Sequence, residues 1–258
     1  MGGHLRGPTL IQSVQRALRL LEIVAEHDGR ARAKEIARAA DLPLATTYHL
    51  LRTCAHEGWL QRLDDGSYVL GHRIDVVRER GTAARGVAQA RPALEWLRDE
   101  LGGAVYLGHF VDGEVVVAEI VDSARAPRID LWVGLHDAAH ATALGKCILG
   151  QLPVDDRDDY LARHPLHDLT PRTAVDRRHL RLPLPGQPAT DDGEYAVGVS
   201  CLAAPVVSGR GAGAVGVVVG PAAIRRAEVR TTLFLAAARV SRALTLAGQV
   251  PPARIGTI

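Results

Sequence analysis

The sequence predicts an α+β protein of two domains, and three observations support this. The chain has 258 residues, 47% of them hydrophobic, which is too long for one small helical domain and apolar enough for two cores. Apolar residues recur at helical spacing in the first part of the chain, and alternating strand patterns begin after residue 103. We therefore place one domain at residues 10–72, a helical linker at 73–90 and a second domain at 91–250.

Three helices are expected in the first domain. The opening helix is amphipathic, with an apolar face made by Val14, Leu18, Leu21 and Ala25. Ser13 fits its N-cap. Residues 34–40 form a second helix that ends at Asp41, and Pro43 suits the first position of a third helix over residues 44–54. This pattern predicts a helix-turn-helix.

The third helix has two different faces. One face can pack inward and carries Thr47, Leu51 and Cys54. The other carries Ala45, Tyr48, His49 and Arg52. Small, aromatic and basic groups on a short exposed helix can enter the major groove of DNA, where Arg pairs with guanine. We interpret this segment as a recognition helix.

A hairpin follows the third helix. Residues 59–63 and 67–70 form strands around Asp64-Asp65-Gly66, because Asp-Gly favours a tight turn. Residues 33–52 taken alone also fit an ordinary helical hairpin with a solvated charged face, but the opening helix and this hairpin, or wing, favour a winged DNA-binding domain. The residues expected to contact DNA are Lys34, Ala45, Thr46, Thr47, Tyr48, His49, Arg52 and Arg62.

The second domain begins after a helical stretch at residues 74–85, broken at Gly81 and resumed at 86–101. Asp112-Gly113 then marks a hairpin between strands 104–111 and 114–121. Further strands are predicted at 129–135, 200–207 and 214–219, and helices at 143–151, 155–163 and 224–246. This order predicts a sandwich of sheet and helices suited to sensing a ligand.

Charge and composition limit the function classes. The net charge of +2 lies in residues 1–80, which hold 12 Lys and Arg against 10 Asp and Glu. So small an excess favours an oligomer that combines several phosphate-binding surfaces. The three cysteines, Cys54, Cys147 and Cys201, form no metal motif and are expected as reduced thiols. Without an apolar run of membrane-spanning length or a signal-peptide core, we expect a cytoplasmic protein.

Many segments of the chain resemble the motifs of IclR-type transcriptional regulators. Residues 13–21 (SVQRALRLL) resemble the opening helix of that family, 42–51 (LPLATTYHLL) its recognition segment and 68–71 (YVLG) the end of its wing. In the second domain, the resemblance is carried by residues 140–146 (HATALGK), 169–173 (LTPRT), 198–206 (GVSCLAAPV) and 220–221 (GP). The similarity covers residues 10–247 with the motifs in the order of the family.

The resemblance implies a GAF-like effector domain and a cytoplasmic dimer or tetramer that binds a palindromic operator. We expect a repressor, with activation as the alternative that the sequence leaves open. It also implies that a small organic effector, with no cofactor, changes DNA binding. The effector contacts of the family correspond to Thr142, Ala143 and Leu144 at the start of a helix, Asp191 in a loop, Cys201 on a strand, and Val217, Val218 and Val219 on the last strand.

Two departures from the family pattern bear on the effector. Val217 and Val219 replace hydroxyl residues found in relatives that bind small oxoacids, so a more apolar carboxylate or phenolic effector is expected, with Val217→Ser weakening its binding. Its polar end would meet the amides of residues 142–144. Three prolines in residues 180–189 also forbid the helix that the family would continue there, which affects how Asp191 is placed.

Other interpretations of these residues remain open. Cys201 fits a buried apolar position, Asp191 a solvated turn acid, and Thr142 a helix cap. Cys201, His140 and Asp191 could serve a thiol- or metal-dependent hydrolase, although no local activating motif accompanies them. The side chains considered for a metal site are His136, His140, His164, His167 and Asp168. A purely architectural DNA-binding protein would not need the second domain.

Overall fold

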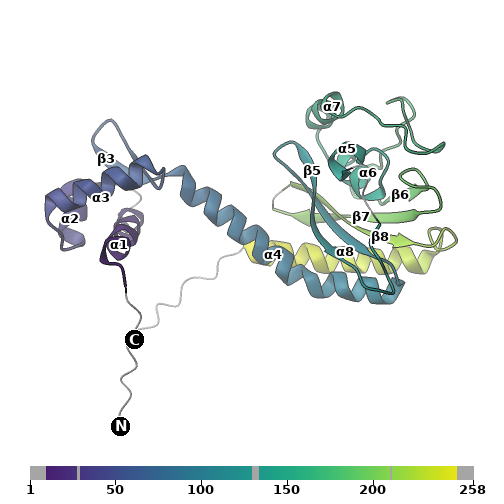
Figure 1. Cartoon of the computed structure of the whole chain (residues 1–258), viewed down its shortest axis with the longest axis horizontal. Coiled ribbons are helices and arrows are strands. Elements are labelled where there is room, and N and C mark those ends of the chain that lie inside the picture. The colour runs from purple at the N-terminus through teal and green to yellow at the C-terminus, as the bar shows by residue number, and fades with distance from the viewer. Residues whose placement is uncertain (1–9, 28–29, 130–133, 210, 249–258) are drawn as a thin grey trace, which may run out of the picture. The chain divides into compact units, whose positions relative to one another are not determined.

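The computed structural model describes residues 10–27, 30–129, 134–209 and 211–248. The chain divides after Gly81 into two compact units, which are described separately (Figure 1). The predicted α+β class is confirmed, since helices and antiparallel sheets occur in both units.

The first unit combines three helices with a small sheet. The helices are α1 Gln12–Glu26, α2 Ala33–Ala39 and α3 Leu44–His56. The strands are β1 Ala31–Arg32, β2 Leu60–Arg62 and β3 Ser67–Leu70, in the antiparallel order β1-β3-β2. The helix-turn-helix and the hairpin are confirmed, and the two-residue β1 was not predicted. Helix α2 ends at Ala39, and Asp41 in the turn after it has φ 50°. Pro43 is the N-cap of α3 rather than its first residue.

The buried face of α1 differs from the predicted one. Leu20, Ile23 and Val24 are fully buried, whereas Val14 and Leu18 are 52% and 56% exposed. Both sets stand at helical spacing, so only the packing of α1 on the other helices and β3 selects between them. The prediction of Ser13 as N-cap was also wrong, because α1 begins at Gln12 after Ile11 and has no side-chain cap.

Helix α4, His72–Leu101, is continuous through Gly81 and Pro92, so the predicted break at Gly81 was wrong. A glycine inside a helix costs only about 1 kcal/mol relative to alanine, which does not require a break. The second unit, from Thr82 onward, therefore starts within this helix. Ala90, Leu94 and Leu97 of α4 are fully buried in its core.

A five-stranded antiparallel sheet in the order β5-β4-β8-β7-β6 forms the centre of the second unit. Its strands are β4 Val105–Val111, β5 Glu114–Val121, β6 Ala189–Asp192, β7 Ser200–Ser208 and β8 Gly211–Val219. Asp112 and Gly113 both have positive φ, 52° and 82°, which confirms the predicted tight hairpin turn.

Helices cover both faces of this sheet (Figure 1). On one face, α4 and α8 Ala227–Gly248 share a core with the strands. On the other face lie α5 Leu135–Ala138, α6 Ala143–Leu149 and α7 Val154–Arg163. Helices α6 and α7 share a second core with the strands, and Ala138 of α5 belongs to a small cluster with Ala141 and Tyr195. We call the two faces of the sheet the α8 face and the α6 face.

The predictions for residues 129–135 and for residues 180–191 have different outcomes. Of the strand expected at 129–135, residues 130–133 lie outside the described part, Ile129 is in no strand, and Leu135 begins α5. Residues 180–188 contain no helix, as the prolines predicted, and lead into β6. Asp191 therefore lies on a strand rather than in the expected loop, because residues 189–192 pair with β7.

Candidate DNA-binding surface and ligand pocket

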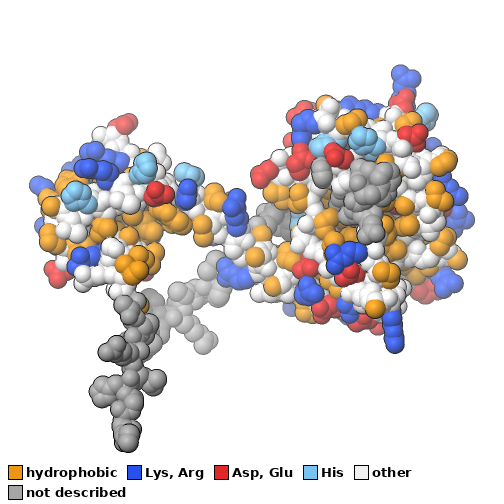
Figure 2. Space-filling model, in the orientation of Figure 1, with side chains coloured by type: hydrophobic (Ala, Val, Ile, Leu, Met, Phe, Trp, Pro, Cys, Tyr) orange, Lys and Arg blue, Asp and Glu red, His pale blue; other side chains and the backbone are white. Residues whose placement is uncertain are grey.

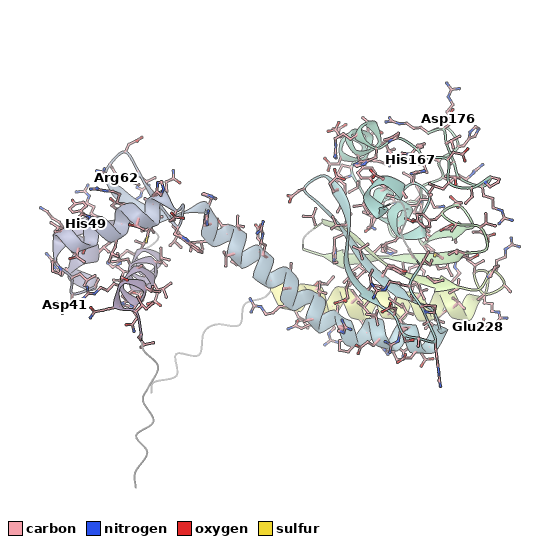
Figure 3. The ribbon with its side chains drawn as sticks, viewed as in Figure 1. Asp41, His49, Arg62, His167, Asp176 and Glu228 are labelled. Atoms are coloured by element: carbon pink, nitrogen blue, oxygen red, sulfur yellow. The ribbon has the colours of Figure 1, made fainter. Side chains whose placement is uncertain are left out.

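The exposed face of α3 carries most of the predicted DNA-binding residues. Ala45, His49 and Arg52 are exposed, and the ring of Tyr48 is 44% exposed. Lys34 on α2 and Arg62 on β2 are exposed as well. Lys, Arg and His side chains gather over the part of the unit that holds α3 and the hairpin (Figure 2), and Figure 3 labels His49 and Arg62 there.

Thr47 does not belong to this surface. Its side chain is fully buried, and its hydroxyl donates a hydrogen bond to the carbonyl of Pro43 at 3.2 Å. It shares the inward face of α3 with Leu51 and Cys54, so the expectation that its side chain contacts DNA was wrong. The neighbouring Thr46 is half-buried.

On the α6 face of the second unit, a cavity lies between the sheet and α6. It encloses about 450 Å³ when its open mouth is counted, of which about 40 Å³ is free to the centre of a water-sized sphere. Its lining residues are Tyr106, Val117, Ile129, Thr142, Ala143, Leu144, Asp191, Tyr195, Cys201, Gly216 and Val217. Six of the eight expected effector contacts are among them. The sequence analysis missed five lining residues, Tyr106, Val117, Ile129, Tyr195 and Gly216. No short-range sequence pattern shows that β4 and β5 lie in the same sheet as β7.

Asp191 is the most deeply buried polar group of the cavity, at 1% exposure. Its Oδ1 accepts hydrogen bonds from the amides of Glu194 at 2.7 Å and Tyr195 at 3.3 Å. Burial raises the pKa of Asp191 to about 6, against the lowering effects of the Glu194 amide and of Lys146. The solvated turn acid considered from the sequence is therefore excluded.

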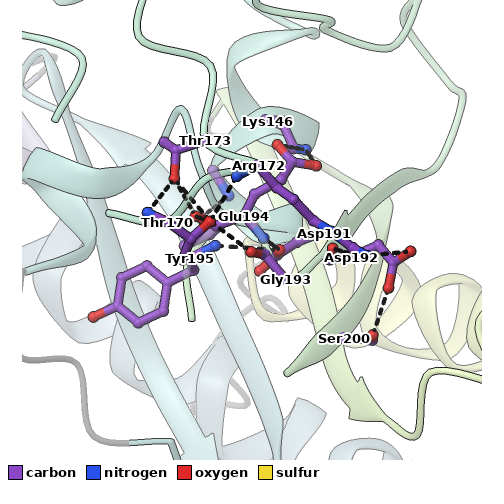
Figure 4. A network of polar contacts seen from close by, with 12 residues as sticks. Lys146, Thr170, Arg172, Thr173, Asp191, Asp192, Gly193, Glu194, Tyr195 and Ser200 are labelled. Carbon is purple, nitrogen blue, oxygen red and sulfur yellow. Dashed lines mark hydrogen bonds and ion pairs between the residues drawn. The ribbon is translucent and has the colours of Figure 1, made fainter. Parts of the chain in front are cut away.

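A polar network fixes the chain from Asp191 to Tyr195 (Figure 4). Lys146 of α6 donates to both carboxylate oxygens of Glu194, at 2.5 and 2.6 Å. Thr170 and Thr173 donate to the backbone carbonyls of Gly193 and Glu194, at 2.7 and 2.5 Å. The 169–173 motif therefore positions the turn that follows Asp191.

The register of β8 bears on the expected contacts at Val217 and Val219. Val217 and Val219 belong to the core on the α8 face, whereas Val218 packs with the core on the α6 face. Side chains alternate along a strand, so the Val217 side chain packs toward the α8 face, although Val217 is among the residues that line the cavity. Gly216, which pairs with Tyr106 of β4, occupies the position that faces the cavity. Val217 therefore stays a candidate effector contact as a lining residue, whereas Val219 is absent from the cavity lining.

Thr142 both caps a helix and lines the cavity. Its hydroxyl accepts a hydrogen bond from the amide of Gly145 at 3.0 Å, which is the capping role weighed from the sequence. Cys201 lies opposite Asp191 in the β6–β7 register. Burial, and then the charge of Asp191, raise the pKa of the Cys201 thiol, so a nucleophilic thiolate is disfavoured.

The geometry does not favour the catalytic or metal interpretations. His140 is buried with its Nε2 at 3.0 Å from the carbonyl of His167, and burial lowers its pKa. Within the described ranges, no group of three or more His, Cys, Asp or Glu side chains could hold a metal ion.

None of the helices described is long and apolar enough to cross a membrane.

Two family models match the chain. The IclR helix-turn-helix domain matches residues 13–64, and the bacterial transcriptional regulator IclR C-terminal domain matches residues 72–244. The transcriptional repressor IclR of Escherichia coli is 31% identical over 202 residues, covering 75% of this chain and 74% of that protein. The acetate operon repressor of Salmonella typhimurium is 30% identical over 201 residues, covering 75% of this chain and 73% of that protein.

Solved structures share the fold. An IclR homolog from Microbacterium hydrocarbonoxydans, complexed with 4-hydroxybenzoate, has a TM-score of 0.54 at 23% identity and covers 90% of this chain and 99% of that chain. The IclR of Thermotoga maritima has the same TM-score of 0.54 at 22% identity, with 90% and 98% covered.

Proposed function

The chain belongs to the IclR family of transcriptional regulators, and we propose that it is a repressor whose operator binding is controlled by a small carboxylate or phenol bound in the cavity around Asp191. This family regulates transcription and is not enzymatic, so the hydrolase alternative is abandoned. The helix-turn-helix supports binding to operator DNA.

One observation carries the effector proposal. Thr142 at the N-cap of α6, Asp191 on β6 and Cys201 on β7 are distant in the sequence and line a single cavity. Apolar groups from β4, β5 and α6 surround them, which suits a ligand with an apolar or aromatic body and one or two polar ends. The 4-hydroxybenzoate bound by the Microbacterium protein has this chemistry and serves as a probe.

For DNA recognition, we propose that α3 enters the major groove and presents Ala45, Tyr48, His49 and Arg52, with Thr46 at its edge. Lys34 and Arg62 would contact flanking phosphates. We further propose a cytoplasmic homodimer or homotetramer, because two half-sites need two such helices. Light scattering after size exclusion would measure the oligomeric state.

The effector proposal is tested by calorimetry on the full chain. The ligand panel contains aromatic acids, their amides, phenols and glyoxylate-sized acids, and the operator is found by genome-wide footprinting. Aromatic members should bind and change operator affinity. Tight binding of only the smallest and most polar acids would refute an apolar pocket.

A steric variant should locate the site. A Cβ at Gly216 would lie 3.4 Å from Leu144 Cδ1, an ordinary contact, so Gly216→Ala should fold with a smaller cavity and Gly216→Val with a smaller one still. Effector affinity should fall in that order. Gly220→Ala, where a Cβ meets nothing within 4 Å, is the matched control.

A further inference from the structure

The charge inside the cavity creates a problem for an acidic ligand. Among the described lining residues, Asp191 is acidic and none is Lys, Arg or His. A carboxylate ligand would therefore place a second negative charge close to Asp191, in a space with mostly apolar walls. Two carboxylates at such close range cannot both stay ionised without a large penalty.

The nearest cation does not remove this penalty. The Lys146 ammonium acts on Asp191 only through its charge, because both of its short hydrogen bonds go to Glu194, at 2.5 and 2.6 Å. The side chain of Lys146 is 6% exposed and is absent from the cavity lining. Asp191, Lys146 and Glu194 together carry a net charge of −1 when all three are ionised.

One oxygen of Asp191 remains available to a ligand. Oδ1 is occupied by the two backbone amides, whereas Oδ2 makes no hydrogen bond to any described residue. The carboxyl lines the cavity at 1% exposure. A protonated Asp191 could donate from Oδ2 to a ligand carboxylate, and an ionised Asp191 could accept from a protonated ligand.

We propose that an acidic effector binds this cavity together with one proton, which its carboxyl group shares with Asp191. This inference rests on the proposed function of the cavity. The proton comes from solvent, so one carboxylate of the ligand, one of Asp191 and one H⁺ give a single O–H···O hydrogen bond with a total charge of −1. The acid is then bound as a half-protonated pair of carboxyl groups.

The surroundings of Asp191 agree with this proposal. The ionisable groups that face it are Lys146 from α6, Cys201 from β7, Glu194 after β6, and Tyr106 and Tyr195 across the cavity. Burial already holds the pKa of Asp191 at about 6 without ligand. A second carboxylate would raise this pKa further, so proton uptake should be nearly complete at neutral pH.

The test is calorimetric titration of the wild-type full chain at pH 7 in buffers of different ionisation enthalpy. The probes are benzoate, 4-hydroxybenzoate and the two corresponding amides. We expect uptake of about one proton with the acids and none with the amides. Between about pH 6.5 and 8, the Kd of the acids should rise by up to about tenfold per pH unit, while the Kd of the amides stays constant.

Two variants locate the proton. Asp191→Asn keeps a carbonyl oxygen for the amides of Glu194 and Tyr195, and should abolish both proton uptake and the pH dependence. Asp158→Asn removes one exposed carboxylate from α7 and should change neither.

The outcomes separate this inference from the proposed function. Acids that bind without proton uptake would overturn the inference and leave the cavity as the effector site. The same conclusion follows if amides bind and acids do not at any pH from 5.5 to 8. If no aromatic acid, amide or phenol binds at all, both proposals fall.

Discussion

Replacing Lys146 with Met should destabilise the second unit strongly. Met keeps the length of the Lys stem, so the packing of α6 is preserved and the loss is confined to the ion pair with Glu194 at 2.5 Å. Removing one partner of a buried pair costs about 3–5 kcal/mol. Because the Glu194 side chain is 23% exposed, we expect the lower end, about 3 kcal/mol.

In a unit of this size, 1 kcal/mol shifts the melting temperature by about 2–4 °C, so Lys146→Met should lower it by about 6–12 °C. Calorimetry would measure this shift. Hydrogen exchange should show lost protection in residues 143–149 and 189–195, with helices α1 to α3 unchanged. The double variant Lys146→Met/Glu194→Gln, which also removes the unpaired Glu194 carboxylate, should recover most of the loss.

Two results would contradict the role given to the Lys146–Glu194 ion pair. A change below 2 °C in the single variant would show that Glu194 is satisfied by solvent. A double variant no more stable than Lys146→Met would show that the loss comes from packing rather than from the unpaired carboxylate.

Three further predictions follow from the structure. Arg52→Ala should weaken specific operator binding by about 1–3 kcal/mol in fluorescence anisotropy at fixed salt, and unchanged affinity would remove Arg52 from the reading surface. Gly145→Ala should destabilise the second unit by at least about 1–3 kcal/mol, because its Cβ would lie 2.4 Å from backbone atoms of Ala139. Gly81→Ala, where a Cβ meets nothing within 4 Å, should instead stabilise α4 by up to about 1 kcal/mol. Thermal unfolding of both variants tests this. Because the folded-state pKa of Asp191 is raised from 3.8 to about 6, the stability of the wild type should fall as the pH rises from about 4 to about 6. In urea unfolding, the free energy of unfolding of Asp191→Asn relative to wild type should increase by up to about 3 kcal/mol between pH 4 and pH 8. A difference that does not change with pH would contradict the raised pKa.

The Arg52 prediction depends on α3 alone. Single helices and turns of this kind could be predicted from the sequence because neighbouring residues determine them. The hairpin at Asp112-Gly113 and the turn at Asp41 are set by residues a few positions apart, whose backbone preferences act locally. The prolines that prevent a helix over 180–188 act in the same way.

The make-up of the cavity depended on contacts between distant segments. The pairing of β6 with β7 put Asp191 on a strand, and the pairing of β8 with β4 turned the Val217 side chain toward the α8 face and Gly216 toward the cavity. Local sequence patterns do not reveal the order of strands in a sheet. The sequence analysis therefore missed Tyr106 and Tyr195 as lining residues.

The sequence by itself therefore determined which segments are helices, turns and most of the strands, and which family the motifs resemble, because these depend on short-range periodicity and backbone preference. Only the tertiary structure decided which face of each element is buried. Both apolar stripes of α1 satisfy helical spacing, and both faces of β8 are apolar, with valine at three successive positions, 217–219. The choice between equivalent faces is made by the elements packed against them, at long range in the chain.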